Sequence, residues 1–206
     1  MSGAFPISTA KFGTLGIKSN QTTIISKSDS GKKLARQIDN QRWGFTVQII
    51  TAKRSDVYGD LMAFIVKQRS GKENFTIIPP EIEDARGNET GSVLVNGVHA
   101  VGDTTIAMDA FGSDGAGRFK AGDFLKFASH TKVYMVVSDV TSSSNAATVT
   151  IEPPLITALA DDSAVTYDNV PFTVYLTSDV QEFGVSGSDK DGNLYYEYQF
   201  DVEEAL

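Results

Sequence analysis

The sequence has no cysteine and only two histidines among its 206 residues. Without cysteine, the chain has no disulfide framework, thiolate zinc site, iron–sulfur cluster or cysteine nucleophile. Its uninterrupted apolar runs are only a few residues long, so we expect no insertion into a membrane. The first residues lack a basic patch followed by an apolar stretch, so no secretory signal is expected either.

Motifs typical of catalysis are also missing. The sequence contains no GxSxG, no HExxH and no phosphate-binding glycine loop. His99 and His130 lie beside expected strand ends without suitable partners, and we interpret both as loop or surface residues. Carboxylates such as Asp123, Glu152 and Glu182 are too common on soluble surfaces to identify a glycosidase pair, which leaves that activity as a third hypothesis. The sequence therefore predicts a non-enzyme that uses no cofactor.

One stretch resembles the start of a calcium loop, because oxygen-bearing residues alternate from Asp189 to Asn193. The bidentate acid required at the twelfth position would fall at Phe200, so the pattern fails. Asp, Gly and Asn tolerate the backbone conformations of tight turns, so we interpret the stretch as a hairpin turn and predict no metal site.

A basic patch formed by Lys32, Lys33, Arg36 and Arg42 precedes two aromatic residues, Trp43 and Phe45, a combination that can bind single-stranded nucleic acids. The two aromatics fall on an expected core face, and the chain as a whole is acidic, with a formal net charge of −8. We therefore expect no sequence-specific nucleic-acid binding and interpret the patch as a solvated surface or a subunit contact.

Charge is divided unevenly along the chain. Residues 1–80 carry a net charge of +7, and residues 81–206 carry −15. Such polarity can steer and align subunits that pack against one another, although two modules with different surfaces would give the same pattern.

Two segments alternate between apolar and polar residues with the period of a half-buried strand, and together they supply most of the expected core. In 42–51 the apolar side includes Trp43, Phe45 and Val47. In 194–203 the apolar face contains Tyr196, Tyr198 and Phe200. Faces of this length need a second sheet, a barrel interior or a helix to cover them.

A helix is expected at about 55–70. Its apolar residues recur at helical spacing, at Val57, Leu61, Phe64 and Ile65. Ser55 is placed to cap the start, and Gly71 is placed to end the helix. Gly59 lowers the intrinsic helix propensity, so the helix is expected to close one end of a barrel or cover a sheet through tertiary packing.

After Pro79-Pro80 the sequence changes to short strand-like pieces separated by turns, which is typical of a small barrel or sandwich. The alternating style returns near residue 170. The predicted fold is therefore all-β with one notable α-helix: a split barrel formed by 1–88 and 169–206, carrying an inserted β-module at 89–168.

Several segments resemble a known family. Phe5-Pro6, the strand RWGFTVQIITA, the helix DVYGDLMAFIVKQRSG and the strand ENFTIIPP are similar to the tube-type β-barrel of bacteriophage distal tail and tail-tip proteins. FKAGDFLKFASHTKVYMVVSDV and ATVTIEPPLITAL resemble a β-module inserted in tail and baseplate-hub proteins. NVPFTVYLTSDVQEF and LYYEYQFDVEEAL resemble the last strands of that barrel.

The resemblance implies a structural virion protein, assembled in the host cytoplasm, that forms a ring, expected to be hexameric, at a tail tip or baseplate hub. Its expected partners are copies of itself, the tail tube protein and other tail-tip or baseplate proteins. The polar stretch 14–40 is predicted to be a long hairpin or arm that reaches a neighbour.

The alternative function is a carbohydrate-binding β-module for host recognition, with Tyr175, Phe183 and Tyr195 as candidate stacking residues. The candidates for subunit contacts are Lys32, Lys33, Arg36, Tyr175 and Tyr195.

Overall fold

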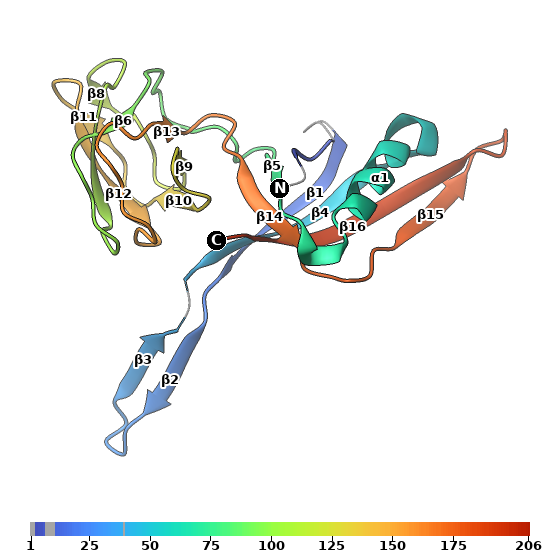
Figure 1. Cartoon of the computed structure of the whole chain (residues 1–206), viewed down its shortest axis with the longest axis horizontal. Helices are drawn as coiled ribbons and strands as arrows, with labels where there is room; N and C mark the ends of the chain where they lie inside the picture. The colour runs from blue at the N-terminus through green and yellow to red at the C-terminus, as the bar shows by residue number, and fades with distance from the viewer. Residues whose placement is uncertain (1–2, 7–10, 39) are drawn as a thin grey trace.

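The computed structural model describes residues 3–6, 11–38 and 40–206, and it contains two β-barrel-like bodies and a projecting arm (Figure 1). In the larger body, the strands follow the order β1-β4-β16-β14-β5, and β15 pairs with β16. Each neighbouring pair in this sheet is antiparallel. The strands are β1 (Phe12–Asn20), β4 (Arg42–Lys53), β5 (Phe75–Ile77), β14 (Phe172–Leu176), β15 (Phe183–Ser188) and β16 (Leu194–Glu204).

The start of the chain brings the two edges of this sheet close to closure. Ala4 forms a parallel bridge with Thr76 of β5, where Phe5 N–H donates to the Thr76 carbonyl at 2.7 Å. The Phe5 ring lies 5.5 Å from that of Phe200 and also contacts Phe12, Phe64 and Phe75. The segment around Ala4 and Phe5 therefore lies against β5, which is one edge strand of the sheet. The first strand after this segment, β1, forms the other edge. The sheet is nearly closed, which confirms the predicted barrel.

The helix is shorter than the sequence predicts and begins differently. A π-helical turn, η2 (Arg54–Tyr58), precedes α1 (Gly59–Lys67), and Ser55 makes no capping hydrogen bond. Leu61 and Ile65 are buried and pack into the barrel core. The helix therefore covers the barrel, as its apolar periodicity indicates.

The helix ends at Lys67, and the left-handed residue that follows its cap is Arg69, with φ 53°, rather than the predicted Gly71. Gly71 lies in the following 3₁₀ turn, η3 (Ser70–Lys72). A Cβ atom on Gly71 would lie 2.5 Å from the carbonyl oxygen of Leu176. The glycine is therefore needed for close approach to β14, which local sequence does not reveal.

The smaller body lies between β5 and β14 in the chain. Its main sheet has the order β13-β9-β10-β12-β7-β6. Backbone hydrogen bonds from Val95 to Ser163 and from Val165 to Val93 join the first and last strands and close a small barrel with its own core. The strands are β6 (Leu94–Val95), β7 (Thr105–Asp109), β9 (Phe124–Phe127), β10 (Val133–Val136), β12 (Ala147–Glu152) and β13 (Val165–Thr166), with a separate pair β8 (Gly115–Ala116) and β11 (Thr141–Ser142).

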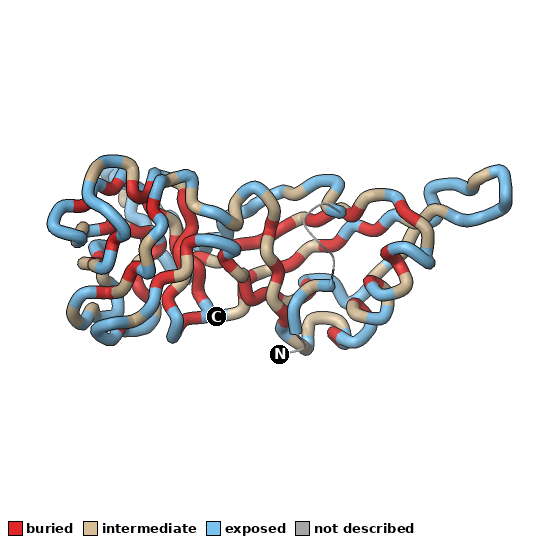
Figure 2. The backbone as a smooth tube through the Cα atoms, turned by 90° about the horizontal axis from the view of Figure 1, so that it is seen from above, coloured by how far each residue is buried: buried red, intermediate tan, exposed pale blue. Residues whose placement is uncertain are grey.

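The arm is a two-stranded ribbon of β2 (Thr23–Lys27) and β3 (Lys33–Gln37) that projects from the ends of β1 and β4 (Figure 1). Every residue of both strands is exposed. Elsewhere, buried residues run through the larger barrel and the module (Figure 2). This confirms the hairpin part of the prediction for 14–40, in which residue 39 lies outside the described residues, while its contact with a neighbour stays a prediction. Among the described residues, no helix has the length and apolar character needed to cross a membrane.

Candidate assembly site

The two barrels meet at a buried junction where β4 and β16 of the larger barrel contact β10 of the module and the residue before it. The indole N–H of Trp43 in β4 donates to the Val133 carbonyl at 2.9 Å. The Trp43 ring packs edge-on against Phe124, with ring centroids 5.1 Å apart, and Phe124 packs on Phe172. Phe124 and Val133 belong to the core of the larger barrel. The junction is therefore part of a continuous core that packs the module against the larger barrel.

A fully buried ion pair lies at the centre of this junction. Lys132 precedes β10, Glu204 ends β16, and both side chains are 0% exposed. Lys132 also donates to the Gln41 side chain at 2.8 Å, and Glu204 accepts from the backbone N–H groups of Trp43 at 3.1 Å and Val133 at 2.7 Å. These contacts satisfy both charges inside the protein.

Burial opposes both charges of the pair. It lowers the pKa of Lys132 and raises the pKa of Glu204, while the opposite charge of each partner acts against that shift. Substituting one partner would therefore leave an uncompensated charge in the core.

Lys126 in β9 makes a second link. Its ammonium group donates to the Pro171 carbonyl at 2.8 Å and lies 3.4 Å from the Thr173 hydroxyl. Burial lowers the pKa of Lys126. This link connects the module to β14, on which the chain returns to the larger barrel.

The arm has two different faces. In its register Ile24 is opposite Arg36, and Ser26 is opposite Leu34. Ile38 N–H donates to the Thr22 carbonyl and continues this register. Directly opposite and alternate residues share a face, so one face, here called the apolar arm face, carries Ile24, Leu34, Ile38 and Arg36. Its three apolar side chains are 57%, 52% and 56% exposed.

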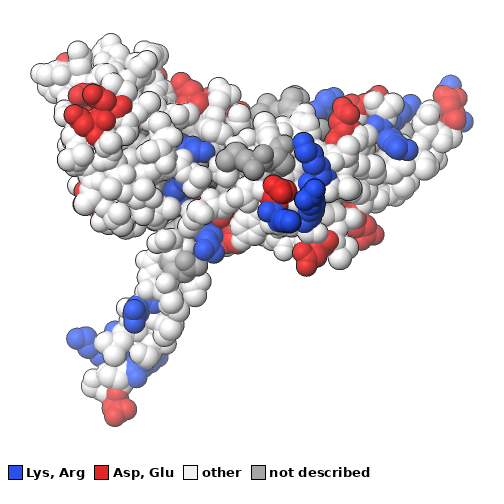
Figure 3. Space-filling model, viewed as in Figure 1, with Lys and Arg blue, Asp and Glu red and all other residues white. Residues whose placement is uncertain are grey.

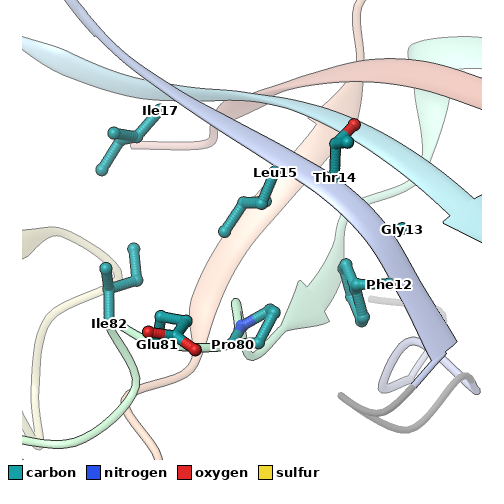
Figure 4. Close-up of a pocket in the computed structure, with 8 residues that line it drawn as sticks. All are labelled: Phe12, Gly13, Thr14, Leu15, Ile17, Pro80, Glu81 and Ile82. Carbon is teal, nitrogen blue, oxygen red and sulfur yellow. The ribbon is translucent and has the colours of Figure 1, made fainter.

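A groove of about 460 Å³ lies at the seam where the larger barrel is least closed (Figure 4). This seam groove is bordered by β1 on one side and by the segment after β5 on the other. Phe12 and Leu15 of β1 point toward that segment. Glu81 is exposed and adopts a left-handed conformation with φ 73°. The lining residues are Phe12, Gly13, Thr14, Leu15, Ile17, Pro80, Glu81 and Ile82.

The predicted core residues lie as follows. Trp43, Phe45, Val47, Tyr198 and Phe200 are buried in the larger barrel. Phe64 and Tyr196 are partly buried and pack against the same core.

The five subunit-contact candidates lie on two parts of the molecule, the arm and the larger barrel. Lys32, Lys33 and Arg36 are exposed on the arm and its turn. Tyr175 in β14 donates to Glu203 at 2.7 Å. Tyr195 in β16 has the Lys53 ammonium 5.6 Å from its ring centre. Phe183, the third candidate for carbohydrate stacking, stacks on Tyr198, with the two ring centroids 4.3 Å apart. Each of these three rings is therefore engaged within the chain.

Both histidines make hydrogen bonds within the module. His130 lies in a loop, as expected, but its side chain is buried, and His99 is partly buried. His130 is 6% exposed, and its Nδ1 lies 2.9 Å from the Tyr134 hydroxyl. The His99 side chain is 14% exposed, and its Nε2 accepts from Ala107 N–H at 3.2 Å. Each fills a hydrogen-bonding position inside the module, which sequence spacing does not disclose.

The acidic motifs have structural partners as well. Asp123 is buried and accepts from the backbone N–H groups of Arg86 and Lys120, at 3.0 and 2.8 Å. Asp189 accepts from Asn193 and pairs with Lys53 at 2.8 Å, and these contacts hold the pKa of Asp189 far below its usual value. The described residues contain no group of three or more potential metal ligands.

Sequence reasoning missed Lys132 and Glu204 as members of the junction. The sequence does contain a signal for Glu204, because it is the next alternate residue after Phe200 and Val202 and therefore faces the core along β16. A carboxylate at an inward strand position requires a buried partner. The identity of that partner, 72 residues away in the chain, could not be found from local pattern.

Comparison with known proteins gives a match for the inserted module. Residues 83–170 match the family model described as distal tail protein pb9, B domain. A search of curated proteins found no match. The matched segment contains the whole small barrel, β6 to β13, together with the Lys132 side of the junction. The inserted module is therefore similar to a domain of a phage distal tail protein, which supports the phage distal tail family that the sequence resembles.

Proposed function

We propose that this chain is a ring-forming structural subunit of a phage tail, placed at the tail tip or baseplate hub, where it joins the tail tube to more distal parts. The observation that carries the proposal is the arm. A two-stranded ribbon with both strands exposed has little stability of its own. A ribbon of this kind, bearing exposed isoleucines, is best explained as a contact that is completed by another molecule.

The charge distribution supports the same function. The arm, residues 23–37, carries a net charge of +3, whereas the module, residues 83–170, carries −7. Figure 3 shows basic side chains along the arm and an acidic cluster on the face of the module. Opposite charges at two ends of one subunit favour head-to-tail association. The buried junction joins the acidic module to the barrel from which the arm projects.

Ring formation, a hexameric stoichiometry, the tube and baseplate partners, and assembly in the host cytoplasm all belong to this proposal. The family of the module is one of structural tail proteins, so the proposal assigns the chain no catalytic activity.

Light scattering on the purified chain, across concentration and salt, tests the proposal. We expect a closed oligomer, or a monomer–ring equilibrium that weakens as salt screens the arm. A strict monomer at every protein and salt concentration would contradict self-assembly and would favour a stand-alone binding module.

A further inference from the structure

The apolar arm face has no cover within its own chain. Figure 1 shows the arm leading away from the barrel, and its strands of five residues reach about 17 Å. The face combines three apolar side chains with one cation, Arg36. A surface that covers it needs an apolar hollow with an acidic group at its border.

The seam groove has this composition. Five of its lining side chains are apolar: Phe12, Leu15, Ile17, Pro80 and Ile82. The carboxylate of Glu81 lies among them. Glu83 and Asp84 follow directly in the chain, and the Oε2 atom of Glu83 is buried without a hydrogen-bond partner. Among the lining residues the one charge is therefore the carboxylate of Glu81, opposite in sign to Arg36.

Two backbone features also indicate an incomplete surface at the groove. In the described sheet, β1 pairs on one side only, with β4, so its other edge faces the seam. Unpaired strand edges readily accept a further chain. Glu81 holds a left-handed backbone conformation that is unfavourable for a residue with a side chain, and such conformations gather at functional sites.

We infer that the apolar arm face of one copy docks into the seam groove of a second copy, with Arg36 against Glu81 of the partner. This inference rests on the proposed function and names the contact that would build the ring. The two surfaces are different, so the contact is head-to-tail, the kind that generates rings when its rotation closes.

A matched pair of substitutions tests the docking. Ile24 and Ile25 are adjacent on β2 and both are 57% exposed, but they lie on opposite faces of the arm. Ile24→Asp is expected to raise the concentration needed for ring formation by at least about tenfold, whereas Ile25→Asp changes it by less than about threefold. Circular dichroism of each monomer verifies the fold.

Charge reversal tests the ionic part of the contact. Arg36→Glu and Glu81→Arg are each expected to weaken the ring, and the double variant is expected to recover at least part of the loss. A double variant that is weaker than both single variants would overturn the pairing.

The absence of native cysteine gives a direct test in trans. An Ile24→Cys copy mixed with an Ile82→Cys copy should form a mixed disulfide dimer, and an Ile25→Cys copy should not. If wild type forms rings but both arm cysteines cross-link equally poorly, the docking is wrong while the ring stands. If wild type forms no oligomer and no cross-link appears, both the docking and the proposed function fail.

Discussion

Lys132 of the module and Glu204 at the end of the last barrel strand form an ion pair in which both side chains are completely buried. Breaking a buried pair by removing one partner typically costs about 3–5 kcal/mol, because the other charge is left uncompensated. Glu204→Gln or Lys132→Met should therefore lower the free energy of unfolding by that amount. The double variant should cost less than either single change.

Trp43, the single tryptophan, lies at this junction, so its fluorescence during urea denaturation measures the loss of unfolding free energy. The control is Lys18→Met, which removes the Lys18–Asp201 pair, whose side chains are 53% and 47% exposed. That change should cost less than about 1 kcal/mol. Equal effects of the buried and the exposed substitutions would contradict the structural role of the pair.

Gly71 provides a second prediction about stability. A methyl group there would meet the Leu176 carbonyl at 2.5 Å, and the neighbouring atom is rigid backbone. We expect Gly71→Ala to lower the free energy of unfolding by about 1–3 kcal/mol, measured by thermal or urea unfolding. Gly187→Ala is the matched control, since nothing lies within 4 Å of its new Cβ, and it should stay within about 0.5 kcal/mol of wild type.

His130 predicts a dependence of stability on pH. Burial lowers its pKa from the ordinary 6.5, so the folded chain binds this proton less readily than the unfolded chain. The stability contributed by the neutral ring is present above about pH 6.5 and is lost as the pH falls through the folded-state pKa.

The hydrogen bonds of His130 agree with a neutral ring. The Tyr134 hydroxyl accepts from Ile156 N–H at 3.3 Å and can donate its own proton to His130 Nδ1. His130→Asn should therefore flatten the loss of stability below pH 6.5, measured as unfolding free energy at several pH values. An unchanged slope would show that the buried ring does not titrate in this range.

Much of the fold follows from alternation in the sequence. Phe45 and Val47 are inward-facing because apolar residues recur at every second position, and the same rule places Tyr198 and Phe200. The helix at 59–67 follows from Leu61 and Ile65, which are one turn apart. These predictions succeed because each depends on neighbours in the chain.

The failures depend on contacts between distant segments. Gly71 is required because β14 packs closely against it. The His130 side chain is buried where Tyr134 and the Ala158 carbonyl provide its hydrogen-bond partners. Lys132 is buried because it pairs with a carboxylate in the last strand. The sequence indicates Lys32, Lys33 and Arg36 as contact candidates, which stays a prediction, and it does not indicate the apolar residues that share the arm with them. Ile24 and Leu34 share a face only once the register of the hairpin is known.

The arm also makes a prediction about dynamics. Its amides are hydrogen-bonded only across a two-stranded ribbon in which every residue is exposed, so they should exchange rapidly in the monomer. The amides of β4 and β16 in the barrel core are expected to be protected in every state, because both strands have buried, paired neighbours. If another copy covers the apolar arm face, exchange at 23–37 should slow in the assembled ring while exchange in β4 stays the same. Hydrogen exchange with mass spectrometry on the two states measures this difference, and equal protection of the arm in both would show that the arm is not an assembly contact.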